Sequence, residues 1–524
     1  MKNKILKSKI MKTRRNILFP AFLTGYSFLL AGLLIFGSCS RPVSNTTGWD
    51  YNNPDYGGFE YVDYPGQETG PGLILIEGGT IAVGQTEQDV VYEWDNIPRR
   101  ITVSSFYMDE NEIRNVDYRE YLYWLSRIFL DYPEVYKKAL PDTLVWRSKL
   151  GWNEPYVELY LRHPAYQEYP VVGVNWLQAC DYSAWRTDRV NEWILILEGF
   201  LDPDPNQQGE ENFNTDAYLA SQYEGAVRGP GMEDLDPNKD FRKVRMEDGI
   251  FLPRYRLPTE GEWEFAALAL IENTIEERVY ERKLFPWNGR SSYIRNPEHR
   301  VMGQIMGNHV RGRGDYMGTA GALNDKADIT APVKSYWPND YGLYCMAGNV
   351  SEWVMDVYRP LSYEIMDEFR PFRGNIFKTQ VRDEEGAIAE KDSLGRITFR
   401  EVTYEESYDR MNYNYANNIN NWDGDFQSSI YYNQDDKAAT HTTNDGMYAY
   451  GRWTGQGIQK SERGVGATSL ITDYARVYKG GSWKDRTYWI IAGQRRYLEQ
   501  HQSKDDLGFR CAMARVGSPV GNNY

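Results

Sequence analysis

A stretch near the middle of the chain combines turn-forming glycines with a carboxylate. Gly342 and Gly348 can adopt backbone conformations that other residues resist, so we expect tight turns around them. Such turns present backbone carbonyls inward, and Glu352 adds a carboxylate beside them. One carboxylate among several carbonyl oxygens suits a hard cation such as calcium. We expect Trp353, the next residue, to anchor the segment in a hydrophobic core.

A second stretch carries three alternating carboxylates, Glu260, Glu262 and Glu264. One interpretation is a catalytic site, in which paired carboxylates act as general acid and general base. The other is a helix start, because the helix dipole stabilises acidic side chains there and Thr259 with Glu262 has the spacing of a capping box. We favour the helix start, since capping accounts for the spacing without catalysis.

The beginning of the chain differs from the rest. Residues 1–15 carry seven basic and no acidic side chains, residues 17–36 are apolar, and a Gly-Ser-Cys sequence ending at Cys39 follows. This order is typical of a secretory signal peptide. A cysteine directly after small residues resembles a lipoprotein signal, so we expect removal of residues 1–38 and acylation of Cys39, for example with palmitate. The alternative is an uncleaved membrane anchor.

The charge of the chain excludes two kinds of partner. The formal net charge is −15, and it becomes −22 without the seven positive charges of the signal peptide. Binding to nucleic acid needs clustered Lys and Arg, and broad adsorption to anionic lipid also needs positive charge. We therefore expect neither, and the acyl chains would provide the membrane attachment.

Three cysteines follow the proposed lipidation site, at Cys180, Cys345 and Cys511. Oxidation of two of them in an exported protein would leave one over. Because no pair has the spacing of metal ligands, we expect buried, unreactive thiols.

Local patterns predict the elements that position these groups. Residues 39–71 are rich in Asn, Gly, Pro, Asp and Tyr without periodicity, which indicates a flexible, lipid-attached tether. Residues 73–84 predict two strands around a Gly-Gly turn, and residues 101–109 predict another strand. Helices are expected from Asn115 as N-cap, from Asn175 as N-cap, and after Leu-Pro-Thr.

Two stretches interrupt a domain that we place at residues 72–516, before a short tail at 517–524. Residues 187–250 are rich in Asp, Glu, Asn and Gly, and residues 361–474 are acidic at first, then rich in Asn and Tyr, then rich in Gly. Both are interpreted as insertions. The many aromatic side chains of the second favour docking on a partner, and the alternative is that it covers a cleft of the domain.

Several of these stretches resemble motifs of the formylglycine-generating enzyme (sulfatase-modifying factor) family. The segment 342–353 is similar to its Gly-Leu-Tyr-(Asp/Asn)-Met-x-Gly-Asn-Val-x-Glu-Trp signature. Leu-Pro-Thr-Glu-Gly-Glu-Trp-Glu at 257–264, Gly-Gly-Ser at 480–482 and Gly-Phe-Arg-Cys at 508–511 are similar to further motifs. The resemblance implies an α+β fold that is C-type-lectin-like and loop-rich, with little regular secondary structure and with large insertions.

The resemblance does not extend to the residues of catalysis. The family's enzymes bind copper through two cysteines just after Gly-Gly-Ser, and the aligned positions here hold Asp485 and Ile490. Copper(I) requires soft thiolate ligands, so the resemblance implies neither copper nor catalytic residues. An iron-dependent branch uses histidines, but no pair of histidines here has metal-binding spacing.

An enzyme of altered chemistry is the alternative. It would use Asp485, Arg486, Arg495 and Arg496 around the residual cleft of the fold. We favour a buried salt-bridge network for these four residues.

The resemblance also implies calcium in a structural role. One site would use the side chains of Asn308 and Asp325 with the backbone carbonyls of His309 and Ala327.

A second site would use the carbonyls of Gly348 and Val350 and the side chain of Glu352. Its remaining ligand position holds Cys345, where the family has Asp or Asn, and a thiol is a poor calcium ligand.

A lipid-anchored chain with these insertions, and without the copper cysteines, resembles the non-enzymatic lipoproteins of type IX secretion and gliding motility. The resemblance implies a scaffold component on the outer membrane that faces the periplasm. Its expected partners are other secretion and motility components of the periplasm and outer membrane, with participation in an oligomer or ring.

Overall fold

The computed structural model describes residues 42–85, 90–91, 96–236, 238–270, 283–287, 300, 302–310, 327, 329–358, 378–401, 451–454, 457–460 and 474–517. The chain divides into two compact units. The smaller, the N-terminal unit, comprises residues 1–61 and 233–242, and the main unit comprises residues 62–232 and 243–524.

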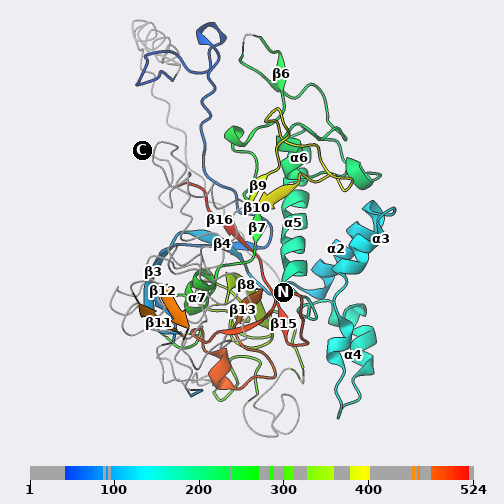
Figure 1. Ribbon diagram of the computed structural model, residues 1–524, viewed down its shortest axis with the longest axis vertical. Helices are drawn as coiled ribbons and strands as arrows, with labels where there is room; N and C mark the ends of the chain where they lie inside the picture. Colours follow the sequence, from blue (N-terminus) through cyan, green and yellow to red (C-terminus); the bar gives the residue numbers. More distant parts are fainter. Residues whose placement is uncertain are drawn as a thin grey trace, which may run out of the picture. The chain divides into compact units, whose positions relative to one another are not determined.

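Two four-stranded sheets form the framework of the main unit (Figure 1). The first has the order β1 (Leu73–Ile76), β4 (Phe106–Asp109), β16 (Ala512–Ala514) and β7 (Tyr255–Arg256). The second has the order β14 (Arg496–Glu499), β13 (Ala475–Lys479), β8 (Ser351–Val357) and β15 (Leu507–Gly508). Within these two sheets β8 and β15 pair in parallel, and the other neighbours pair antiparallel. Because β16 lies between β4 and β7, the first sheet requires strands from both ends of the main unit.

Helices and short hairpins surround these sheets. The helices are α2 (Asn115–Ile128), α3 (Pro133–Ala139), α4 (Glu154–Leu159), α5 (Trp176–Leu197), α6 (Thr215–Leu219) and α7 (Glu260–Leu268). The two-stranded sheets pair β2 (Gly79–Val83) with β3 (Arg99–Val103), β5 (Met232–Glu233) with β6 (Phe241–Arg242), β9 (Lys378–Gln380) with β10 (Phe399–Glu401), and β11 (Gly451–Thr454) with β12 (Gly457–Lys460). This is the α+β, loop-rich architecture that the sequence predicts.

The two strands around the Gly-Gly sequence exist, but they do not pair with each other. β1 pairs with β4 and β2 pairs with β3. The predicted strand 101–109 is interrupted between β3 and β4, where the Ser105 hydroxyl accepts a hydrogen bond from the Gly78 N–H at 3.0 Å. A Cβ at Gly78 would lie 2.3 Å from the Val103 carbonyl oxygen, so the backbone at Gly78 passes close to the end of β3.

The helix starts are mostly those predicted. Asn175 with Gln178 and Thr259 with Glu262 form reciprocal capping boxes. For α2 the prediction is wrong by one residue, because Arg114 is the N-cap. The buried Asn115 amide instead donates to the Tyr160 and Tyr166 carbonyls at 3.1 and 2.9 Å.

Both insertions contain ordered, packed segments. Helix α5 extends eleven residues into the stretch 187–250, which also forms a hydrophobic cluster around Phe213, Tyr218 and Tyr223. Within the second insertion, the loop between β9 and β10 contacts the first one, because Gln222 donates to the carbonyls of Ile388 and Ala389 at 3.2 and 3.1 Å. This loop of the second insertion therefore packs on the first.

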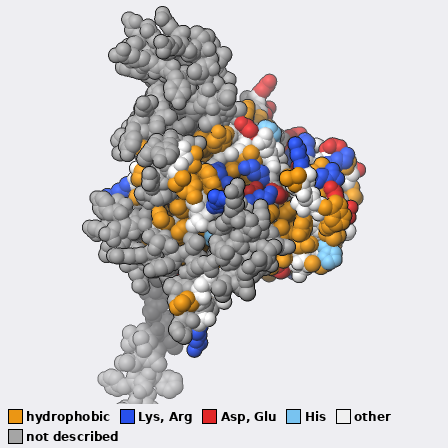
Figure 2. Space-filling model, turned by 90° about the horizontal axis from the view of Figure 1, so that it is seen from below, with side chains coloured by type: hydrophobic (Ala, Val, Ile, Leu, Met, Phe, Trp, Pro, Cys, Tyr) orange, Lys and Arg blue, Asp and Glu red, His pale blue; other side chains and the backbone are white. Residues whose placement is uncertain are grey.

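One face of the described structure is chemically mixed (Figure 2). On the face shown in Figure 2, hydrophobic side chains are interspersed with basic and acidic ones. In the part of the chain that the structure describes, no helix has both the length and the apolar character needed to span a bilayer.

Candidate functional site

The central turn holds the conformation that its glycines suggest. Gly342 and Gly348 have φ values of 88° and 81°. A Cβ at Gly348 would lie 2.3 Å from the Asn308 carbonyl oxygen, so only glycine fits this approach. The turn leads into β8, where Trp353 is fully buried and donates from its indole N–H to the Val174 carbonyl at 3.0 Å.

The Glu352 carboxylate is not open to a ligand. It is fully buried, and Arg510 binds both of its oxygens, with Nη2 at 2.6 Å from Oε1 and Nε at 2.7 Å from Oε2. The indole N–H of Trp263 donates to Oε2 at 2.7 Å. A calcium ion would share this carboxylate with a guanidinium in the same buried space. The second calcium site therefore does not fit as the resemblance implies.

Glu112 belongs to this centre, although no sequence motif points to it. Its carboxylate accepts hydrogen bonds from the Asn349 side-chain amide at 2.6 Å and from the Val350 N–H at 3.1 Å. Burial, followed by the nearby charge of Glu352, raises the pKa of Glu112 well above its usual range. The glutamate holds the turn from 237 residues away in the chain, and no local pattern marks such a contact.

The first calcium site fits better. Asn308 is buried, and its side-chain N–H₂ donates to the Ile329 carbonyl at 2.8 Å and to the Asn349 side-chain oxygen at 3.2 Å. Its own side-chain oxygen has no hydrogen-bond partner within the described structure. A buried, unsatisfied oxygen is a group that a bound cation would satisfy.

The other groups expected at that site are partly described. His309 is fully buried beside Asn308, and Ala327 is buried in a small cluster with Ile305. Asp325 lies outside the described residues. Among the residues that are described, no group of three or more His, Cys, Asp or Glu side chains is arranged to hold a metal ion. A calcium ion here would therefore depend on amide and carbonyl oxygens together with Asp325.

The two positions that would need copper-binding thiols have other roles. Asp485 accepts hydrogen bonds from Arg496 Nη1 and from the Ser482 hydroxyl, both at 2.8 Å. Ile490 is fully buried in a hydrophobic cluster with Phe285 and Trp287. A neutralised carboxylate and a core aliphatic side chain offer copper(I) no soft ligand.

The three alternating glutamates separate into two roles. Glu262 caps α7 and binds Arg256 through two contacts of 2.7 Å, as the helix-start interpretation predicts. Glu260 and Glu264 are buried instead beside Lys479, whose Nζ lies 3.4 and 2.9 Å from their carboxylate oxygens. Helix capping therefore accounts for only one of the three.

Arg495 completes this buried ion-pair cluster, with Nη2 at 3.1 Å from Glu260. Burial disfavours the charge of Glu260, but Arg495 and Lys479 outweigh that effect and lower its pKa to about 2. Asp356 accepts a hydrogen bond from the Glu260 N–H at 2.6 Å. Burial, followed by the charge of Glu260, raises the pKa of Asp356 to about 7.

Three of the four residues of the altered-chemistry alternative, Asp485, Arg495 and Arg496, form ion pairs within the fold. Arg495 and Arg496 belong to the ion pairs above, and Arg486 is exposed. A cavity of about 680 Å³ lies elsewhere, lined by residues that include Asp181 of α5, Arg256 of β7 and Arg476 of β13. None of the four residues of the alternative lines it.

The thiols match the expectation of unreactive cysteines. Cys345 and Cys511 are buried, Cys180 is half-buried, and all three are free. Burial raises the pKa of each thiol, which leaves little reactive thiolate at neutral pH.

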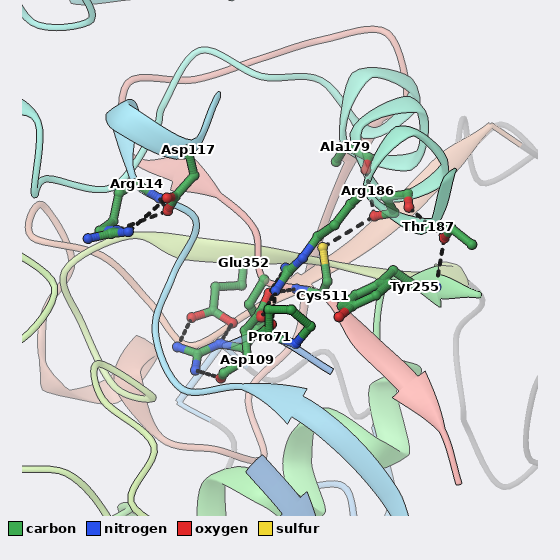
Figure 3. A network of polar contacts seen from close by, with 12 residues as sticks. Pro71, Asp109, Arg114, Asp117, Ala179, Arg186, Thr187, Tyr255, Glu352 and Cys511 are labelled. Atoms are coloured by element: carbon green, nitrogen blue, oxygen red, sulfur yellow. Dashed lines mark hydrogen bonds and ion pairs between the residues drawn. The ribbon is translucent and has the colours of Figure 1, made fainter. Parts of the chain in front are cut away.

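A further buried ion pair joins helix α5 to the first sheet (Figure 3). Arg186 binds both oxygens of Asp109 at 2.8 Å, and its guanidinium lies 4.4 Å from the centre of the Tyr255 ring. Asp109 also accepts from the Cys511 N–H at 2.8 Å. The Gly-Phe-Arg-Cys segment is thus held by buried carboxylates on both sides.

Comparison with curated proteins finds both active and inactive relatives. The chain is 23% identical over 316 residues to the formylglycine-generating enzyme of Mus musculus, a match that covers 59% of this chain and 65% of that protein. It is 31% identical over 138 residues to the enzyme of Thermomonospora curvata, covering 26% and 39%. It is also 23% identical over 322 residues to the inactive C-alpha-formylglycine-generating enzyme 2 of Mus musculus, covering 57% and 73%.

The matches span less than two thirds of each of these two formylglycine-generating enzymes. Among solved structures, the chain is similar to PvdO from Pseudomonas aeruginosa, with 15% identity, a TM-score of 0.38, and coverage of 86% and 100%. Residues 59–515 match the sulfatase-modifying factor enzyme 1-like domain. The chain therefore belongs to the family of proteins that carry this domain.

Proposed function

We propose that this protein is a lipid-anchored, non-enzymatic scaffold component of a type IX secretion or gliding-motility assembly. It would be attached to the outer membrane through acylated Cys39 and would face the periplasm. The observation that carries the non-enzymatic part is the state of Asp485 and Ile490, one paired with Arg496 and the other buried in a hydrophobic cluster. Similarity to proteins named as inactive members of the family is compatible with this role.

Sequence resemblance supports the finer assignment. Thr-Thr-Gly-Trp-Asp-Tyr at 46–51, Leu-Pro-Asp-Thr-Leu-Val-Trp at 140–146 and Arg-Gly-Arg-Gly-Asp-Tyr at 311–316 most resemble gliding-motility lipoprotein J. Lipoprotein K of the same system is the near alternative. The segment 311–316 lies outside the described residues.

The second insertion is our candidate for the partner interface. Residues 402–450 lie outside the described structure, and they include Trp422, Tyr431 and Tyr432. Aromatic side chains are enriched at protein interfaces because they bury large rigid areas at low entropic cost. Strand β10 of the main unit ends at Glu401, directly before this segment.

Isolation of the full chain from membranes tests the proposal. After mild crosslinking, we expect an acylated N-terminus at Cys39 and co-purification of other secretion components. A variant lacking residues 402–450 should remain membrane-bound but lose those partners, whereas retained partners would place the interface elsewhere. Oxidation of the cysteine in a sulfatase-derived peptide by the copper-treated protein would refute the non-enzymatic role.

A further inference from the structure

The described part of the N-terminal unit, residues 42–61 and 233–242, is folded although its first segment was expected to be a flexible tether. The Ser44 N–H donates to the Trp49 carbonyl and the Tyr51 N–H to the Pro42 carbonyl, both at 2.8 Å. The side chain of Asn52 closes a loop by accepting from the Tyr61 N–H at 2.7 Å and donating to its carbonyl at 2.9 Å.

A buried ion pair joins the two segments of this unit. Arg242 is buried and binds Glu60, with its Nε at 3.1 Å from Oε1, and the Leu235 N–H donates to the same oxygen at 3.4 Å. A Cβ at Gly58 would lie 1.8 Å from the Leu235 carbonyl oxygen, so the segments touch closely. The unit is therefore a defined surface and not a solvated linker.

That surface is unusually aromatic. The rings of Trp49 and Tyr56 lie 6.0 Å apart, and Tyr51 stacks on Tyr61 at 5.4 Å. The fractional exposure is 58% for Trp49, 48% for Tyr56, 66% for Phe59 and 50% for Tyr61. Four large aromatic side chains thus expose about half or more of their surface within a stretch of thirteen residues. Clustered exposed apolar surface of this kind indicates an interaction site.

The covalent structure brings this surface close to a membrane if Cys39 is acylated, which is part of the proposed function. Pro42 is three residues after Cys39, and three extended residues span about 10 Å. The ordered unit therefore starts within about 10 Å of the lipid anchor, which is comparable with the depth of the headgroup layer.

We propose that the N-terminal unit lies in the headgroup region of the bilayer, with Trp49, Tyr56 and Phe59 as its lipid contacts. Tyr and Trp favour this region because one part of the side chain is apolar and the other is polar. The acyl chains hold the protein on the membrane, and the short link gives the aromatic residues a high effective concentration at the surface. They orient the unit without needing to bind lipid strongly by themselves.

The net charge of the N-terminal unit indicates which lipid headgroups it can lie against. Its described residues include seven acidic and two basic side chains, a net charge of −5. Anionic lipid attracts basic segments and repels acidic ones. The unit therefore suits zwitterionic lipid and should rise away from a strongly anionic surface.

Depth-dependent fluorescence quenching tests the inference. The full acylated chain is reconstituted in phosphatidylcholine vesicles that contain lipid brominated near the headgroup. We expect the bromine to quench part of the tryptophan emission, and the W49F variant to lose most of that quenched component. W152F is the matched control, because Trp152 is 81% exposed but belongs to the main unit. Replacing half of the lipid by phosphatidylglycerol should reduce the quenching.

The outcomes separate this inference from the proposed function. Two outcomes would overturn the inference and leave the lipid anchor intact, provided that the protein floats with the vesicles. In the first, the bromine quenches the tryptophan emission of wild type and W49F equally. In the second, the quenched component is lost in W152F. Protein without acyl mass on Cys39 that does not float overturns both.

Discussion

Replacing Arg510 by methionine should strongly destabilise the main unit. Arg510 and Glu352 are both fully buried, and two hydrogen bonds of 2.6 and 2.7 Å join them. Methionine retains much of the side-chain volume but removes the positive charge. Glu352 would then remain buried near a second carboxylate, that of Glu112, which already responds to its charge.

The magnitude follows from that geometry. Removing one partner of a buried ion pair costs about 3–5 kcal/mol, because an uncompensated charge stays in a low-dielectric interior. Arg510 also donates to the carbonyls of Asp109 and Tyr344 at 3.1 and 2.8 Å, and these would lose their donor. Single domains have about 5–15 kcal/mol of stability in total. We therefore expect the variant to lose a large share of its free energy of unfolding.

Urea unfolding of residues 40–524, followed by fluorescence and circular dichroism, measures this loss. The double variant E352Q/R510M should recover much of the stability, because no unpaired charge remains. K137M is the control, since Lys137 and Glu134 form an exposed pair whose loss should leave the midpoint nearly unchanged. A free energy of unfolding for R510M within about 1 kcal/mol of wild type would refute the reasoning, given the magnitude expected for a buried pair.

Three further outcomes are expected. The pKa of Asp356 is raised to about 7, mainly by burial, so the folded state binds an extra proton between about pH 4 and pH 7 and loses stability as the pH rises through that window; D356N should flatten this part of a denaturation series. The purified domain should contain calcium and no stoichiometric copper, and a chelator should lower its Tm in wild type but not in N308A, since a ligand of the native state adds stability by mass action. C39S should release the chain from the membrane fraction, and a variant that stays there would contradict the lipid anchor.

Local patterns accounted for the elements that the sequence predicted correctly. The capping boxes at Asn175 and Thr259 join residues three positions apart. The glycine at position 348 predicts a turn, and its φ is positive in the structure. Such signals lie within a few residues of each other and can be read directly.

The sequence-based predictions failed where the structure depends on contacts between segments that are far apart in the chain. Two strands were expected around the Gly-Gly turn, but β1 pairs with β4 and β2 pairs with β3, and neither pairing can be read from the local sequence. The roles of Glu260 and Glu264 depend on Lys479, more than 200 residues away. Nothing in the alternation of glutamates distinguishes a helix cap from half of a buried ion pair.

The same contacts explain why this chain can resemble an enzyme family so clearly without its copper ligands. Glu352 of the central signature binds Arg510 of the terminal Gly-Phe-Arg-Cys motif, and Trp263 of the Leu-Pro-Thr-Glu motif donates to the same carboxylate. These motifs are therefore joined to one another in the interior, and their residues are needed to close the two sheets. Their presence reports the fold, because loss of Glu352 or Arg510 would leave a buried charge unpaired. The fold does not require cysteine at positions 485 and 490. The residues at these two positions, Asp485 and Ile490, are therefore the ones that distinguish a copper enzyme from a protein that only shares its fold.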